Sequence, residues 1–128
     1  MLLRVSPRKR PKQLSRLLFR GVNPRVVEVR FSIASENDLA DIDTYSMSEF
    51  GSAVAAAYMH SFTSAFQKLR DFPKAGRAMP ELGRGVRYLS HRQHGIIYKL
   101  TRDDLLIVRI VHHAMDAQSA VKQAKHDR

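Results

Sequence analysis

Hydrophobic residues along this chain follow a period of two in some segments and a period near 3.6 in others, which separates strands from helices. The period of two predicts one strand near the beginning and three near the end, the last of them almost wholly apolar. Connections of three residues between the later strands predict an antiparallel meander. The predicted strands are 26–31, 86–91, 95–101 and 105–112.

Helical spacing predicts two helices between the first strand and the later three. We expect Ser35 to be the N-cap of the first helix, since a serine oxygen accepts hydrogen bonds from the free amides of a first turn. Gly51 should end that helix, because glycine adopts a positive φ without a Cβ penalty. The second helix, 52–71, carries an apolar stripe and ends before Pro73. The very short connection between the two helices predicts that they form an antiparallel helix hairpin.

These elements together predict an α+β domain. It consists of an N-terminal strand, an antiparallel helix hairpin packed on a small antiparallel β-sheet, and a short C-terminal helix from about Asp116. The glycine- and proline-rich stretch 73–85 is expected to be an ordered surface loop. A chain of 128 residues suggests one domain, which we expect to cover 26–128.

The positive charge of the chain is concentrated at its beginning. The formal net charge is +10, but residues 1–25 hold eight of the 22 Lys and Arg and no acid, which leaves 26–128 at +2. One interpretation of 1–25 is a flexible basic arm that contacts phosphates non-specifically. Others are an organelle transit peptide, or residues from an early start codon with no selected role.

Several classes of chemistry are excluded by what the sequence lacks. Without cysteine there is no disulfide or thiolate metal site, which favours a reducing cytoplasm. No apolar run approaches the roughly 20 residues of a membrane helix, and neither a P-loop nor a nucleophile elbow is present. His91 and His94 lie in a predicted turn with no carboxylate nearby, so we expect no metal site and no cofactor.

Side-chain parity along the last three strands predicts two different sheet faces. The even positions are almost all apolar and should receive the helix hairpin; they are Val86, Tyr88, Ser90, Ile96, Tyr98, Leu100, Leu106, Val108, Ile110 and His112. The odd positions mix apolar residues with cations, which suits a binding surface for a macromolecule. Alternatively, the final helix or the basic extension covers this second face. The candidate partner-binding residues are Arg87, Lys99, Arg109 and His113, followed by Arg84 and Arg77 of the loop.

The histidine pair at the end of the last strand offers a catalytic alternative. Parity sends His112 to the helix side and His113 to the cationic face, beside Arg87 and Arg109. An imidazole beside two guanidiniums can assist cleavage of a phosphodiester by acid–base catalysis and charge stabilisation. The same three residues are equally suited to bind an acidic protein segment.

The predicted domain carries a series of short motifs in a fixed order. They are Asp71-Phe72-Pro73, Gly76-Arg77, Pro80-Glu81-Leu82-Gly83, Gly85-Val86-Arg87, His94-Gly95-Ile96-Ile97-Tyr98 and the strand from Leu106 to His112. Together with the segment from Ala34 to Tyr45, this order resembles the ParE toxins of the RelE/ParE superfamily. The resemblance covers about 26–121, and the basic extension is outside the usual family pattern.

The resemblance implies a toxin of a bacterial type II toxin–antitoxin operon, on a plasmid or a chromosome, that acts in the cytoplasm. Such a toxin inhibits DNA gyrase by binding, and a ParD-type antitoxin wraps it in a hetero-oligomer. The alternative is a ribosome-dependent mRNA endonuclease of the RelE branch, with Arg87, Lys99, Arg109 and His113 as its cationic set. The domain charge of +2 favours gyrase over a ribosomal partner. A third hypothesis is a nucleic-acid-binding module that acts through 1–25.

Overall fold

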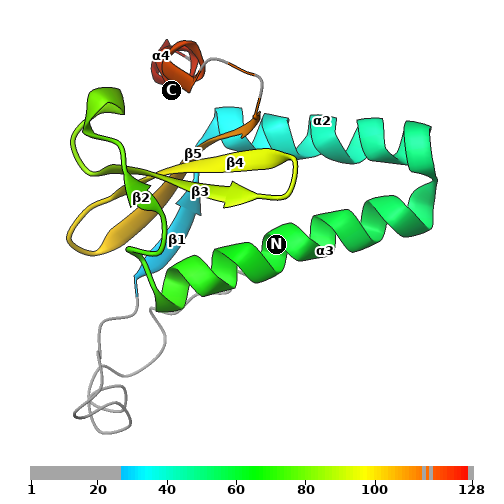
Figure 1. Ribbon diagram of the computed structural model, residues 1–128, viewed down its shortest axis with the longest axis horizontal. Helices are drawn as coiled ribbons and strands as arrows, with labels where there is room; N and C mark the ends of the chain where they lie inside the picture. The colour runs from blue at the N-terminus through cyan, green and yellow to red at the C-terminus, as the bar shows by residue number, and fades with distance from the viewer. Residues whose placement is uncertain (1–26, 114, 116, 127–128) are drawn as a thin grey trace, which may run out of the picture.

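The computed structural model describes residues 27–113, 115 and 117–126. Within them a five-stranded sheet has the strand order β1-β5-β4-β3-β2. The hairpin of α2 and α3 lies on one face and α4 on the other (Figure 1), which confirms the predicted α+β class. In chain order the elements are β1 Glu28–Phe31, α2 Ile33–Phe50, α3 Ser52–Asp71, β2 Arg77–Ala78, the 3-10 helix η3 Pro80–Leu82, β3 Val86–His91, β4 His94–Leu100, β5 Asp104–His112 and α4 Ala117–His126.

Most element bounds agree with the sequence-based expectations. The second helix and the strand 86–91 have the predicted bounds, and β4 and β5 each begin one residue earlier than expected. β3, β4 and β5 form the predicted antiparallel meander. β1 pairs with β5 in parallel, and the stretch 73–85 contains the short β2 and η3. The predicted extension at 1–25 is outside the described residues.

The N-cap of α2 is Ser32, so the prediction of Ser35 is wrong by one helical turn. Ser32 Oγ accepts a hydrogen bond from the Ser35 backbone N–H at 3.0 Å. The Ser32 backbone N–H also donates to the carbonyl of Ile107 at 3.0 Å, and its hydroxyl donates to that of Val108 at 2.7 Å. Pairing of β1 with β5 therefore places Ser32 at the start of the helix, and both serines occupy buried positions.

A single residue joins the two long helices, as predicted. Gly51 has a φ of 88°, and its N–H donates to the carbonyl of Met47 at 3.0 Å. Its own carbonyl accepts from the N–H of Ala55 at 3.1 Å, so the same glycine closes α2 and opens α3. Figure 1 shows that the hairpin extends beyond the sheet at this end.

The larger core lies between the helix hairpin and the sheet. Its buried side chains include Phe62, Phe66 and Leu69 of α3. Tyr98 of β4 is fully buried among them, and burial raises the pKa of its phenol. The phenol is nevertheless satisfied, because it donates to the carbonyl of Pro73 at 2.7 Å and accepts from the Gly76 N–H at 2.9 Å. The loop after α3 is thereby attached to the centre of the sheet.

The smaller core lies between the other sheet face and α4. Ala120 and Val121 of α4 pack against Ile97 and Val111 of the sheet, with Leu82 of η3 at the edge. The final helix therefore covers the second face of the sheet, which is the alternative considered from the sequence. This helix closes the third layer of the domain.

The parity prediction is right for β4 but wrong for β3. The turn at Arg92 and Gln93 contains two residues, so it pairs His91 with His94. Residues opposite each other in this hairpin therefore have numbers of opposite parity. Val86 and Tyr88, expected under the helix hairpin, lie on the α4 face, and Leu89 packs into the larger core.

Parity also fails in the first half of β5, where the register changes. Tyr98 is opposite Ile107 but Ile97 is opposite Arg109, which leaves Val108 as an extra residue. Such a bulge reverses the side-chain pattern along a strand. Leu105 and Ile107 therefore face the helix hairpin, whereas Leu106 and Val108, expected there, face the α4 side. Beyond the bulge, Ile110 and His112 lie on the predicted side.

Side chains of other elements form hydrogen bonds to the bulged edge of β5. β1 ends opposite Ile107, and beyond it Asp38 Oδ2 of α2 accepts the backbone N–H of Ile110 at 2.9 Å. Asp38 also binds Arg109, whose Nε and Nη2 donate to its two oxygens at 2.7 and 2.8 Å. Arg109 Nη1 donates to the carbonyl of Ala120 at 3.0 Å. This buried pair therefore joins α2, β5 and α4.

Substitution of Asp38 by alanine should destabilise the fold strongly. It leaves the Arg109 guanidinium, which is 8% exposed, without its counter-charge, and the Ile110 N–H without its acceptor. Breaking a buried pair in this way costs about 3–5 kcal/mol, measured by urea unfolding. Arg30→Ala is the matched control, since its ion pair with Asp104 is exposed (62% and 38%). That change should cost less than about 1 kcal/mol; equal losses would contradict the argument.

Candidate partner-binding surfaces

The predicted cationic face does not exist as a single surface. Arg87 is opposite Tyr98 and therefore lies toward the helix hairpin rather than beside Lys99. Its Nη1 donates to the carbonyl of Gly76 at 2.5 Å and to that of Lys74 at 3.3 Å. The correction follows from the two-residue turn, which reverses the parity of β3.

Arg109 is the second candidate that the structure reassigns. Its guanidinium is bound by both oxygens of Asp38 and lies under α4. A buried, paired arginine supports the fold and presents little charge to a partner. The sequence did not reveal this pairing, because Asp38 and Arg109 are 71 positions apart.

The remaining candidates lie along the α4 side of the sheet. Lys99 and Arg84 line a small cleft of about 120 Å³ beside α4. The Arg77 guanidinium lies 5.1 Å from the ring centroid of Tyr88, and the Tyr88 hydroxyl is 3.1 Å from His113 Nδ1. His113 Nε2 donates to the carbonyl of Arg92 at 2.8 Å. Partner binding by these exposed residues stays a prediction.

A group of exposed apolar side chains forms a surface that the sequence analysis did not single out. Tyr45, Phe50 and Val54, beside the Gly51 connection, are 63%, 61% and 51% exposed. They line a cleft of about 730 Å³ between the helix hairpin and the turn of β3 and β4. We call it the hairpin cleft; its lining is Asp41, Ile42, Tyr45, Ser46, Phe50, Val54, Ala57, Tyr58, Arg92, Gln93, His94 and His112.

Histidines form one wall of the hairpin cleft. The rings of His94 and His112 meet edge to face with centroids 5.5 Å apart, and His94 Nδ1 is 2.6 Å from the hydroxyl of Tyr58. His91 packs on Phe62 with centroids 4.6 Å apart. The turn histidines thus end two paired strands and face α3. Burial, followed by the charges of His112, His113 and His91, lowers the pKa of His94, although Asp38 opposes the shift.

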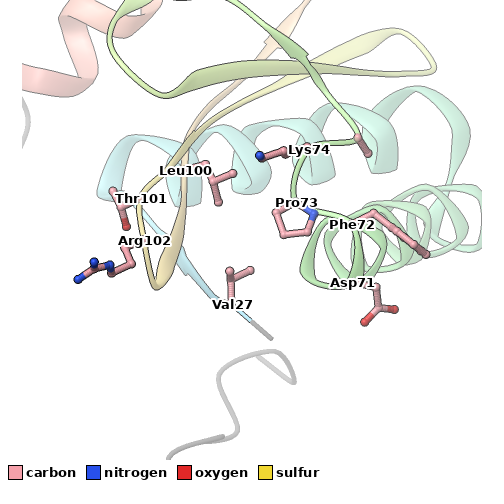
Figure 2. A pocket seen from close by; sticks show the side chains of 9 residues that line it. Val27, Asp71, Phe72, Pro73, Lys74, Leu100, Thr101 and Arg102 are labelled. Atoms are coloured by element: carbon pink, nitrogen blue, oxygen red, sulfur yellow. The ribbon is translucent and has the colours of Figure 1, made fainter. Parts of the chain in front are cut away.

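A second cleft lies at the opposite end of α3, next to the start of β1 (Figure 2). Its volume is about 710 Å³, and it is lined by Val27, Phe72, Leu100 and their neighbours. Phe72 is 66% exposed there.

Among the described residues no group of three or more His, Asp or Glu could hold a metal ion. In the same part of the chain, no helix is long and apolar enough to cross a membrane.

Comparison with known proteins agrees with this architecture. The model of the family described as "ParE toxin of type II toxin-antitoxin system, parDE" matches residues 29–117. Toxin ParE3 of Caulobacter vibrioides is 33% identical over 66 residues, which are 52% of this chain and 66% of that toxin. Toxin ParE1 of Mycobacterium tuberculosis is 29% identical over 86 residues, covering 66% of this chain and 88% of that toxin. A solved structure described as the chromosomal ParDE TA system from P. aeruginosa shares the fold, with a TM-score of 0.60 and 17% identity over 68% of this chain and 96% of that one.

A family match of this length identifies the class of protein, the toxin half of a two-component toxin–antitoxin system. The chain belongs to the ParE toxin family of the parDE type II systems, within the RelE/ParE superfamily. The resemblance stated from the sequence motifs is therefore confirmed.

The histidine wall makes the stability of the domain depend on pH. Burial keeps the pKa of His94 below 6.5, the ordinary value of a histidine, in the folded state. The unfolded chain therefore takes up this proton first, so stability is complete above about pH 6.5 and falls as the pH drops below it. His94→Gln should lose less stability than the wild type between pH 7.5 and pH 5.5, measured by urea unfolding at both values. An equal loss in both proteins would show that His94 does not contribute.

Proposed function

We propose that this toxin inhibits DNA gyrase by binding it in the bacterial cytoplasm, and that a ParD-type antitoxin neutralises it in a hetero-oligomer. Membership of the ParE family is the observation that carries the proposal. The positions of the candidate nuclease residues support it against the RelE alternative. Arg87 contacts the loop after α3, Arg109 is buried with Asp38, and His113 is bonded to Tyr88 and Arg92. These three residues do not converge on one reacting group.

The hairpin cleft is the surface we assign to the antitoxin. Exposed Tyr45 and Phe50 are large apolar side chains of the kind that dominate protein interfaces. Arg92 adds a cation to the lining of the cleft, and Asp41 adds a carboxylate. An antitoxin segment that brings apolar side chains and an acidic residue would complement both features.

Substitution of Phe50 by aspartate tests the assignment of the cleft. We expect the antitoxin affinity to fall about 30-fold, as for an interface residue worth about 2 kcal/mol, measured by isothermal titration calorimetry. Phe50 is 61% exposed, so the change should leave the fold intact. Phe72→Asp is the matched control, because Phe72 is 66% exposed but lies at the other end of α3. Equal losses in both variants would remove the cleft from the proposal.

The choice of target is tested with purified components. The toxin should inhibit supercoiling of plasmid DNA by gyrase, and an equimolar amount of ParD-type antitoxin should restore it. Ribosome-dependent cleavage of mRNA with gyrase unaffected would establish the RelE alternative instead. Deletion of residues 1–25 serves as a control: a gyrase inhibitor keeps its activity, whereas a module that acts through the basic extension loses it.

A further inference from the structure

A shallow trough beside α3 adjoins the hairpin cleft, with which it shares Ala57 and Arg92. It has a volume of about 440 Å³ and lies between one face of α3 and the end of β3. Ser61, Ser64 and Ser90 are among the residues that line it. None of the described residues that line the trough is acidic.

Nitrogen groups supply the rest of the polar lining. Lys68 and Arg92 are exposed cations, and His60 and His91 add imidazoles. Within the described residues the ion pairs are Arg30–Asp104 and Asp38–Arg109, so no carboxylate neutralises Lys68 or Arg92. The trough therefore collects hydrogen-bond donors and positive charge in a domain whose overall charge is only +2.

The backbone of β3 adds a donor of its own. β2 pairs only with Arg87 and Tyr88, so in the described structure the outer edge of β3 has no strand beside it from Leu89 onward. The Val86 carbonyl accepts from Met79 N–H at 2.8 Å, which shows that Val86 directs its backbone groups to this edge. Backbone direction alternates along an antiparallel strand, so the N–H of Ser90 points to the edge as well.

The hydrogen bonds of Ser61 fix the imidazole of His91. Ser61 Oγ donates its one proton to the carbonyl of Tyr58 at 2.5 Å. Its 2.8 Å contact with His91 Nε2 must therefore be an N–H donated by the imidazole. Burial and then the charge of Arg92 lower the pKa of His91. An anion bound beside His91 would favour the charged imidazole and so would raise this pKa.

Arg92 occupies a strained backbone position. Its φ is 54°, and among the described residues it is the one non-glycine residue with a positive φ. This conformation is unfavourable for a residue with a Cβ. Glycine would adopt this φ without strain. The exposed guanidinium at the tip of the hairpin is therefore a reason for arginine at this position. Strain of this kind commonly marks a functional residue.

We infer that the trough binds a phosphate group of a nucleic-acid backbone. Phosphate oxygens only accept hydrogen bonds, and the trough offers hydroxyl, amide, ammonium and guanidinium donors around one hollow without an acid. Lys68 and Arg92 supply the charge, and the Ser90 N–H and the Ser64 hydroxyl fix the orientation. The inference goes beyond the proposed function and does not depend on gyrase or on an antitoxin.

The salt dependence of DNA binding by the full-length toxin tests the inference. Each phosphate contact contributes about 0.9 to the slope of log K against log salt concentration. Lys68→Gln and Arg92→Gly should each reduce that slope by about 0.9, measured by fluorescence anisotropy with a duplex oligonucleotide. Lys122→Gln removes the same charge from the exposed side of α4 and should leave the slope unchanged. The basic residues of 1–25 are present in every variant and cancel in the comparison.

Two further measurements separate binding from effects on folding and identify the ligand. Arg92→Gly should keep or increase the stability to urea, because it relieves the positive φ. In NMR titrations with duplex DNA, the amides of Ser90 and Arg92 should shift, and the pKa of His91 should rise. A duplex RNA of equal length and inorganic phosphate are the parallel arms that distinguish the sources of phosphate. Slopes unchanged in both trough variants, or shifts with inorganic phosphate alone, would overturn the inference.

Discussion

The buried pair of Asp38 and Arg109 is the interaction on which the arrangement of the layers depends. The pairing of β1 with β5 ends at Phe31, and beyond it the side chains of Ser32, the N-cap of α2, and of Asp38 form hydrogen bonds to the edge of β5. Arg109 then connects this edge to the backbone of α4 on the far side. One carboxylate thus aligns the helix hairpin, the bulged strand and the covering helix, and so positions the walls of the hairpin cleft.

The local elements of the fold were predictable, but the side-chain faces of the sheet were not. Helix and strand bounds follow from periodicity, glycine and proline, which act within a few residues. The face of a strand depends on its register, which a two-residue turn at Arg92 and a bulge at Val108 both change. The pairing of Asp38 with Arg109 spans 71 positions, and no local pattern encodes it.

The candidate site was predictable only in part for a related reason. Counting cations located Lys99 and His113 on the side opposite the helix hairpin, but it could not reveal that Arg109 is neutralised or that Arg87 faces the other way. Tyr45 and Phe50 continue the apolar pattern of a helix, and the sequence does not say where the sheet beneath them ends. The hairpin extends beyond the sheet at the Gly51 end (Figure 1), which leaves its aromatic end uncovered.

The Gly51 connection has a consequence for the evolution of specificity in this toxin. A Cβ at Gly51 would meet no atom within 4 Å, so the position is restricted by its φ of 88° and not by crowding. Gly51 is not among the residues that line the hairpin cleft, yet it sets the angle at which α2 and α3 diverge. A change of backbone angle there would widen or narrow the gap between Tyr45 and Val54 while every contacting side chain stayed the same. Under the proposed assignment of the hairpin cleft, divergence in partner choice can therefore begin at a position outside the lining of the cleft.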